Sequence, residues 1–303
     1  MSTPEEQVLL AERPPVTEVA AAEPDEAALA RRERLRLLLR SKTFLAGAVI
    51  FGFWVFCALF GRIIAPESPF ATEILAKLAT PSGEHWFGTD SLGRDVFSRV
   101  LAGARDILIV APLATLLGTV LGTALGLLTG YFRGIVDDVL MRLVDAFLAL
   151  PVVILGLLAL VALGPSRVTV IMVIGIVFAP IIARTVRAAV LSERELEYVA
   201  AARLRNERAP YIMFAEILPN VAAPILVEFT VRLGYAIFAI ATLSFLGFGI
   251  QPPAPDWGLQ IFEHYGLISG GFWWPTLFPA LAIATLVVGV NLIADGITHV
   301  FER

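Results

Sequence analysis

The chain has 303 residues, of which 57% are hydrophobic and only 17% are charged, and its net charge is −4. This composition excludes an ordinary soluble domain, in which about 25% of the residues are charged, and gives no reason to expect a nucleic-acid partner. The single cysteine, Cys57, excludes an intrachain disulfide and a cysteine-based metal site.

The apolar residues are concentrated in six long runs without a charged residue. A helix of about 20 apolar residues crosses the hydrocarbon core of a membrane, so the runs predict an all-α, polytopic membrane protein with six transmembrane helices. The alternating segments of a transmembrane barrel are absent from the sequence. The runs are 43–61, 107–132, 146–166, 168–183, 233–255 and 265–294.

The positive charges orient these spans. With the N-terminus placed in the cytoplasm, 16 of the 23 Lys and Arg residues fall on the cytoplasmic side and six on the opposite side. Cytoplasmic loops carry an excess of Lys and Arg, so both termini are predicted to be cytoplasmic.

Residues 1–43 are predicted to form a cytoplasmic tail that precedes a transmembrane domain at 44–303. The first 30 residues are rich in Ala, Glu and Pro and are expected to be disordered. Residues 31–42 have the pattern of a basic amphipathic helix on the inner membrane surface. Charge that only orients the protein explains them equally well.

The first span is expected at 44–64, and an external segment of about 40 residues follows it. Within that segment, Asp90 or Ser91 could cap a short helix that runs to about Arg105. The second span, at about 107–130, carries glycine at every fourth position. This spacing places the glycines on one helix face and predicts close packing against a neighbouring helix rather than a role in a pore. The glycines are Gly118, Gly122, Gly126 and Gly130.

Charged residues precede the third span, where Asp138–Arg142 and Arg142–Asp145 have the spacing of ion pairs on one helix face. Pro151 is expected to kink that span. A short external turn at 164–167 then leads to the fourth span.

The fifth span is expected at about 221–246 and the sixth to end near Thr298. The loop between them, 247–275, contains tryptophans that we expect to anchor the protein at the outer membrane surface. The three histidines of the chain lack the spacing of metal ligands and are expected to be ordinary loop or helix-end residues. The tryptophans are Trp257, Trp273 and Trp274, and the histidines are His85, His264 and His299.

Residues 193–220 form a charged insert between two apolar stretches. The pattern predicts a helix at 193–204, a left-handed turn at Asn206 and a second helix that opens at Pro210. Pro219 is expected to end that helix and to start the fifth span. The alanines at 200–202 leave a small-residue patch suited to a groove on another protein. The residues alone leave a docking site and a solvated loop as open alternatives.

Within this insert, EYVAAAR and ILPN resemble the cytoplasmic loop of permeases of ATP-binding-cassette (ABC) importers, in which a short helix couples to an ATPase subunit. Asn206 stands where that family has glycine, and asparagine tolerates the same backbone conformation. The resemblance therefore implies an ATPase-coupling site. Its residues are Glu197, Tyr198, Ala201, Ala202, Asn206, Leu218 and Pro219, with Asn220 also matching.

Three further segments, 85–105, 137–151 and 243–258, are similar to the dipeptide/oligopeptide (nickel) group, and among its members to the second-type, C-like permease. The resemblance extends over 44–298 and implies the transmembrane domain of a type I ABC importer in a bacterial inner (plasma) membrane. It implies four kinds of partner: a homologous second permease subunit, two ATPase subunits, an external substrate-binding protein and a peptide substrate. The chain has no GxxxxGK[ST] sequence. We therefore expect a non-enzymatic subunit without a cofactor, with ATP and Mg²⁺ on the partner subunits.

Ionisable residues inside spans are costly and are candidates for function. Glu228 and Arg232 stand one turn apart in the fifth span. They are expected to pair with each other, to present Arg232 to a peptide carboxylate, or to let the Arg232 side chain extend to the inner membrane surface. An acidic residue expected near Ile240 is missing. The translocation-path candidates are Glu228, Arg232, Asp145, Asn291 and Asp295, and the candidates for contact with the binding protein are Asp90, Arg94, Asp256 and Trp257.

Other classes of function remain as alternatives. An ion-gradient-driven secondary transporter or channel predicts paired acids in the spans and inverted repeats, and neither is evident. A membrane-bound enzyme needs a polar catalytic cluster, and we find none in the sequence. An ABC permease for nickel or another small solute is the nearest alternative.

Overall fold

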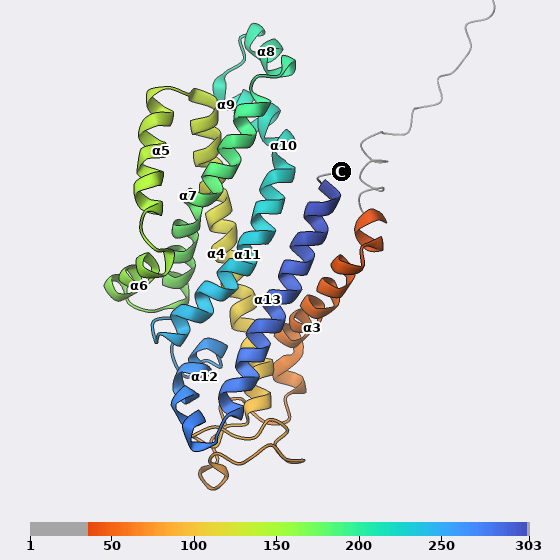
Figure 1. Cartoon of the computed structure of the whole chain (residues 1–303), viewed down its shortest axis with the longest axis vertical. Coiled ribbons are helices and arrows are strands. Elements are labelled where there is room, and N and C mark those ends of the chain that lie inside the picture. The colour runs from red at the N-terminus through yellow and green to blue at the C-terminus, as the bar shows by residue number, and fades with distance from the viewer. Residues whose placement is uncertain (1–35, 302–303) are drawn as a thin grey trace, which may run out of the picture.

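A computed structural model describes residues 36–301 (Figure 1). Within that range the regular structure is helical, which confirms the all-α prediction. The expectations for residues 1–35 lie outside the described residues, and of the predicted basic helix only 36–40 is seen, as a helical turn. The long helices are α3 (Lys42–Ile64), α4 (Val96–Phe132), α5 (Ile135–Leu148), α6 (Val152–Leu163), α7 (Arg167–Glu193), α11 (Ala222–Phe245) and α13 (Trp274–Phe301).

Five of these helices, α3, α4, α7, α11 and α13, are each long and apolar enough to cross a membrane. Helices α5 and α6 pass the same criterion only as a pair, bent by 86° at the break between them. Pro151 stands directly before α6. Proline disfavours helical geometry in the residue before it, so the predicted kink is confirmed and is close to a right angle. Residues 36–301 thus contain up to six spans, with the bent pair counted as one.

Helix α4 is 37 residues long and begins earlier than predicted. Its cap is Asp95, whose Oδ2 accepts a hydrogen bond from the Ser98 N–H at 2.7 Å. The expectation of a short separate helix capped by Asp90 or Ser91 is therefore wrong. Asp90 instead forms a turn of its own, in which Oδ1 accepts from the Leu92 N–H at 2.8 Å. At about 1.5 Å per residue α4 is about 55 Å long, so it extends well beyond the hydrocarbon core.

The glycine face of α4 packs against α7. A Cβ atom added at Gly122 would lie 2.7 Å from the Ala179 carbonyl oxygen, and one at Gly126 would lie 2.8 Å from the Ala183 carbonyl oxygen. Gly118 and Gly130 meet α7 in the same way. These distances are shorter than real Cβ contacts, so only glycine allows the two backbones to approach this closely. The prediction of a packing face is confirmed.

Helices α3 and α13 pack on each other and on the α4 and α11 layer. In Figure 1, α5 and α13 lie on opposite sides of the molecule, with α4, α7 and α11 between them. The short helix α8 (Glu197–Leu204) stands at one end, and the loop segment 65–95 and helix α12 (Trp257–His264) lie at the other (Figure 1). We refer to these as the α8 end and the α12 end.

Two of the predicted tryptophan anchors are core residues of the α12 end. The Trp257 indole N–H donates to the Val100 carbonyl oxygen at 2.9 Å, and its ring packs edge-on against Trp54. The Trp274 indole N–H donates to the Thr89 carbonyl oxygen at 3.0 Å. Both side chains are buried, whereas Trp273 is 45% exposed. The anchor role is therefore wrong for Trp257 and Trp274.

Candidate functional site

The candidate coupling loop, residues 193–220, is built from α8 and a second helical stretch that leads into α11. That stretch consists of α9 (Ala209–Tyr211), the π-helical turn η2 (Ile212–Ile217) and α10 (Leu218–Asn220). Helix α8 packs on η2. Val199 and Ala202, three positions apart on α8, are fully buried. Hence α8 has one face fixed to its own chain.

The turns of the loop follow the sequence prediction. Asn206 has φ of 56°, the left-handed conformation that asparagine tolerates better than most residues. Pro210 lies in the first turn of α9, as expected. Pro219 differs, because it lies in the first turn of α10, and the chain turns two residues later, at Val221.

The opposite face of α8 is exposed. Leu204 is 83% exposed, and Leu196 at the N-cap position is 47% exposed. Ala200 and Ala201, which lie between them, are exposed as well. The prediction of three exposed alanines is therefore wrong for Ala202, which is buried. Because successive helical residues point about 100° apart, Ala202 faces inward when Ala201 faces out.

Charged and aromatic side chains tie the loop to α4 and α7. The Arg194 guanidinium donates to the Tyr131 carbonyl oxygen at 2.6 Å, at the end of α4, and Arg203 lies 5.4 Å from the centre of the Tyr131 ring. The Tyr198 hydroxyl donates to Glu193 Oε2 at 2.7 Å. Desolvation, together with this hydrogen bond, raises the pKa of Tyr198 to about 12. A displacement of α8 would thus be transmitted directly to two membrane-spanning helices.

The sequence missed the link through Tyr131 and Arg194, because the two residues lie 63 positions apart. The remaining predicted coupling residues lie as follows. Glu197 occupies the first turn of α8 and is exposed, and Leu218 and Pro219 are in α10, where Leu218 packs on the core.

Two of the predicted path residues form a pair within α11. Arg232 Nε donates to Glu228 Oε1 at 2.5 Å, and the guanidinium lies 5.3 Å from the centre of the Tyr235 ring. The pairing of Glu228 with Arg232 is therefore confirmed. Ile240, where an acidic residue was expected, is fully buried among neighbouring helices.

Two further path residues, Asn291 and Asp295 of α13, line a hollow between α11 and α13 of about 430 Å³. Tyr235 and Phe238 of α11 line it from the other side and are 57% and 61% exposed. Gly234 makes room for Asn291, because a Cβ atom there would lie 2.5 Å from Asn291 Oδ1. The hollow therefore combines polar groups of α13 with aromatic rings of α11.

Asp145 does not belong to this group. It lies on α5, where it forms an ion pair with Arg184 of α7. Asp137 likewise binds Arg187 of α7 with both carboxylate oxygens, at 2.6 and 2.5 Å. Among the described residues, these pairs to α7 replace the predicted pairs of Asp138 and Asp145 with Arg142, so the acids fix α5 to α7.

The four predicted contacts for a binding protein are buried at the α12 end. Asp90 accepts from Arg94 Nε at 2.5 Å, and Arg94 also binds Glu263 of α12 at 2.8 Å. Asp256 caps α12 by accepting from the Leu259 N–H at 2.8 Å. The four predicted residues, Asp90, Arg94, Asp256 and Trp257, are each at most 6% exposed. Direct contact through them does not agree with their burial. Arg94 instead joins the 65–95 segment to α12, and Trp257 joins α12 to α4.

Comparison with known proteins places these features in a family context. Residues 122–303 match a family described as "Binding-protein-dependent transport system inner membrane component". The chain is 37% identical over 271 residues to the dipeptide transport system permease protein DppC of Alkalihalophilus pseudofirmus, with 89% of each chain covered. It is 37% identical over 269 residues to the di/tripeptide transport system permease protein DppC of Pseudomonas aeruginosa, covering 86% of this chain and 88% of the relative.

A relative with a different printed substrate matches over a similar length. The glutathione transport system permease protein GsiD of Escherichia coli is 37% identical over 284 residues, with 92% of each chain covered.

Proposed function

Because this chain belongs to the family of binding-protein-dependent transport system inner membrane components, the transmembrane domains of type I ABC importers, we propose that it forms half of the translocation path for dipeptides and oligopeptides. The peptide substrate is supported by the relatives, whose printed names refer to dipeptides, di/tripeptides and glutathione. The second half of the path is a homologous permease subunit. ATP and Mg²⁺ bind to two separate ATPase subunits, because this chain has no phosphate-binding loop.

The observation that carries the proposal is the exposed face of α8 at one end of the molecule. Its inner face is fixed by Val199 and Ala202, while Leu204 stands out into the surroundings at 83% exposure. Leu196 is also exposed, with the exposed Ala200 and Ala201 between it and Leu204, and apolar side chains that gather on one exposed face mark an interaction surface. The ATPase subunits bind to this exposed face of α8, so the α8 end faces the cytoplasm. Both termini of the chain are cytoplasmic as well.

The coupling follows from how α8 is attached. An ATPase can change the conformation of the permease only by contacts that differ between its states. When the ATPases close, they displace α8. The contact of Arg203 with the Tyr131 ring, and that of Tyr198 with Glu193, carry that displacement to α4 and α7. The tight glycine seam makes these two helices move as one body, so the path opens by rigid-body rotation.

The path itself runs along the hollow between α11 and α13. Asn291 and Asp295 supply polar groups, and Tyr235 and Phe238 supply exposed aromatic faces toward the second permease subunit. Arg232 stands at the edge of this region, beside Tyr235. Its guanidinium offers donors to a peptide carboxylate, and Glu228 keeps it in place when no peptide is present. At the α12 end, the external binding protein delivers the peptide.

The docking role of α8 is tested by replacing Ala201 with glutamate. Ala201 lies on the exposed face, so the charge should block the ATPase contact without disturbing the fold. The matched control is Ala71→Glu, the same change at an exposed alanine of the 65–95 segment. Co-purification of the ATPase subunits with the tagged chain should be lost in Ala201→Glu and kept in Ala71→Glu. Equal recovery of the ATPases with both variants would contradict the docking role.

A further inference from the structure

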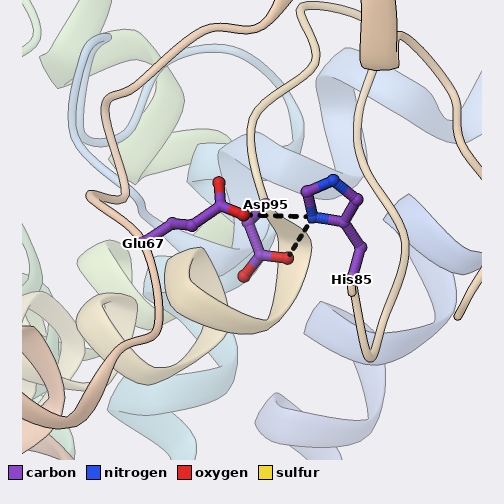
Figure 2. A group of neighbouring side chains, drawn as sticks. All are labelled: Glu67, His85 and Asp95. Carbon is purple, nitrogen blue, oxygen red and sulfur yellow. Dashed lines mark ion pairs between the residues drawn. The ribbon is translucent and has the colours of Figure 1, made fainter. Parts of the chain in front are cut away.

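Glu67, His85 and Asp95 converge at the α12 end, in the loop segment that joins α3 to α4. Figure 2 shows that both carboxylates point at the same ring nitrogen of His85. Glu67 Oε1 lies 3.3 Å and Asp95 Oδ1 3.4 Å from His85 Nδ1. One ligand atom from each residue lies within 4.8 Å of the other two. Three groups that can bind a metal therefore face one small space.

His85 Nδ1 is a buried polar atom without a hydrogen bond among the described residues. The histidine is only 6% exposed. Its backbone is held in place, because its N–H donates to Ser82 Oγ at 3.2 Å and its carbonyl accepts from the Gly88 N–H at 2.9 Å. A buried polar group without a partner is costly and calls for an explanation, and this one is aimed at two carboxylate oxygens.

The distances separate two explanations. A charged hydrogen bond from a protonated histidine to a carboxylate is about 2.7–2.9 Å long. Ion pairs of this chain range from such lengths, as in Arg94–Glu263 at 2.8 Å, to 3.3 Å in Arg205–Glu216. The distances at His85 are about half an ångström longer than a charged hydrogen bond. Two ligand atoms that each lie about 2.0–2.2 Å from a tetrahedral zinc ion are separated by about 3.3–3.5 Å. The two distances at His85 agree with that separation.

Asp95 Oδ2 and the Glu67 backbone N–H already make hydrogen bonds, and these leave Asp95 Oδ1 and Glu67 Oε1 free to bind a metal. Asp95 Oδ2 caps α4 through the Ser98 N–H, so Oδ1 remains for a metal. Ser98 Oγ accepts from the Glu67 N–H at 3.2 Å, which fixes that residue above the start of α4. In natural metal sites, hydrogen bonds to the ligating residues orient them toward the ion.

The charge balance of the cluster favours a cation. The N-terminus of α4 contributes a partial positive charge of about half a unit, and two carboxylates outweigh it. The Glu67 side chain is 34% exposed and provides a route for an ion to enter.

From this geometry we propose that Glu67, His85 and Asp95 bind a zinc ion, with one imidazole nitrogen, two carboxylate oxygens and a water molecule as its ligands. Three protein ligands and one open position are typical of accessible zinc sites. The ion joins the start of the 65–95 segment, its middle and the cap of α4. Zinc therefore stabilises the surface of the α12 end, apart from the coupling loop and the path.

The test uses the full chain, purified in detergent, stripped with a chelator and titrated with Zn²⁺ in competition with a chromophoric chelator. The wild-type chain should bind one Zn²⁺. Loss of a residue that only hydrogen-bonds to a ligand weakens metal binding about 10–100-fold. His85→Gln removes a ligand itself and should therefore weaken binding by at least about 100-fold. His299→Gln, at an exposed histidine near the end of α13, is the matched control and should bind like the wild type.

Two isosteric variants distinguish loss of a metal ligand from loss of the fold. Glu67→Gln changes a partly exposed side chain, and Asp95→Asn keeps a good capping residue; each should elute like the wild type in size exclusion and bind Zn²⁺ at least about tenfold more weakly. X-ray absorption of the zinc-loaded wild type should show nitrogen and oxygen ligands at about 2.0–2.2 Å. A wild-type chain that binds no stoichiometric Zn²⁺, or folded variants that bind it equally well, would overturn the proposal.

Discussion

Replacing Gly122 with alanine tests the seam between α4 and α7, on which the rigid-body account depends. The added Cβ atom would lie 2.7 Å from both the Ala179 carbonyl oxygen and Ile182 Cβ, whereas ordinary contacts lie at 3.4–4 Å. Neither obstacle is the end of a flexible side chain, so the two helices must separate by about 1 Å along the seam.

Two opposing effects set the magnitude. Overpacking a well-packed interface costs about 1–3 kcal/mol, while alanine in a helix interior is about 0.5–1 kcal/mol more favourable than glycine. Gly52 of α3 provides the control, because a Cβ atom there meets nothing within 4 Å. Gly52→Ala therefore carries only the favourable effect, and the difference between the two variants isolates the steric cost of about 1–3 kcal/mol.

The assay is thermal unfolding in one detergent, followed with a thiol-reactive dye. Cys57 is the only cysteine of the chain and is 1% exposed, so the dye reports unfolding. Gly122→Ala should unfold several degrees below Gly52→Ala. The double variant Gly122→Ala/Gly126→Ala should lose less than the sum of the single losses, because the first substitution already separates the helices. If Gly122→Ala unfolded at the same temperature as Gly52→Ala or above it, the tight seam would be refuted.

Three further predictions concern the α12 end and the path. Trp257→Phe leaves the Val100 carbonyl without its indole donor and should lower the free energy of unfolding by about 1–3 kcal/mol, seen as a lower unfolding temperature. Burial raises the pKa of Asp256 from 3.8 to about 6, so ionising this acid in the folded state costs stability as the pH rises from about 4 to about 6, by up to about 3 kcal/mol. Asp256→Asn should therefore resemble the wild type near pH 4 and unfold at a higher temperature above pH 6; a pH-independent difference would contradict this. Arg232→Met in a Glu228→Gln background should reduce peptide uptake more than peptide-independent ATP hydrolysis, and equal loss of both would indicate a folding defect.

Local patterns in the sequence predicted much of the fold. The charge-free runs located the spans, the glycine spacing on 118–130 located the face that packs on α7, and Pro151 located the break between α5 and α6. The size of that break could not be predicted, because proline fixes where a helix stops but the packing of α6 against α7 sets its new direction. In the coupling loop, Asn206 and Pro210 identified the turns, and which alanine faces inward became clear only from the helix phase.

The parts that the sequence did not predict are long-range. Tryptophans at the end of a span resemble interfacial anchors, and only the positions of Val100 and Thr89 show that Trp257 and Trp274 are core residues. Helix α12 was missed, although Asp256 before an apolar stretch is a recognisable cap signal. The histidines showed no ligand spacing because the partners of His85 lie 18 positions before it and ten after it, and only the folded segment brings them together.

The central claim is that ATPase subunits acting on α8 drive transport through this chain. The most direct measurement is uptake of a labelled dipeptide into liposomes that contain this chain and its second permease subunit, with and without the ATPase subunits, and with binding protein and ATP supplied on the sides that the proposed orientation requires. The account predicts accumulation only when the ATPases and ATP are both present, and its loss in Ala201→Glu. Accumulation against a gradient without any ATPase subunit would contradict it.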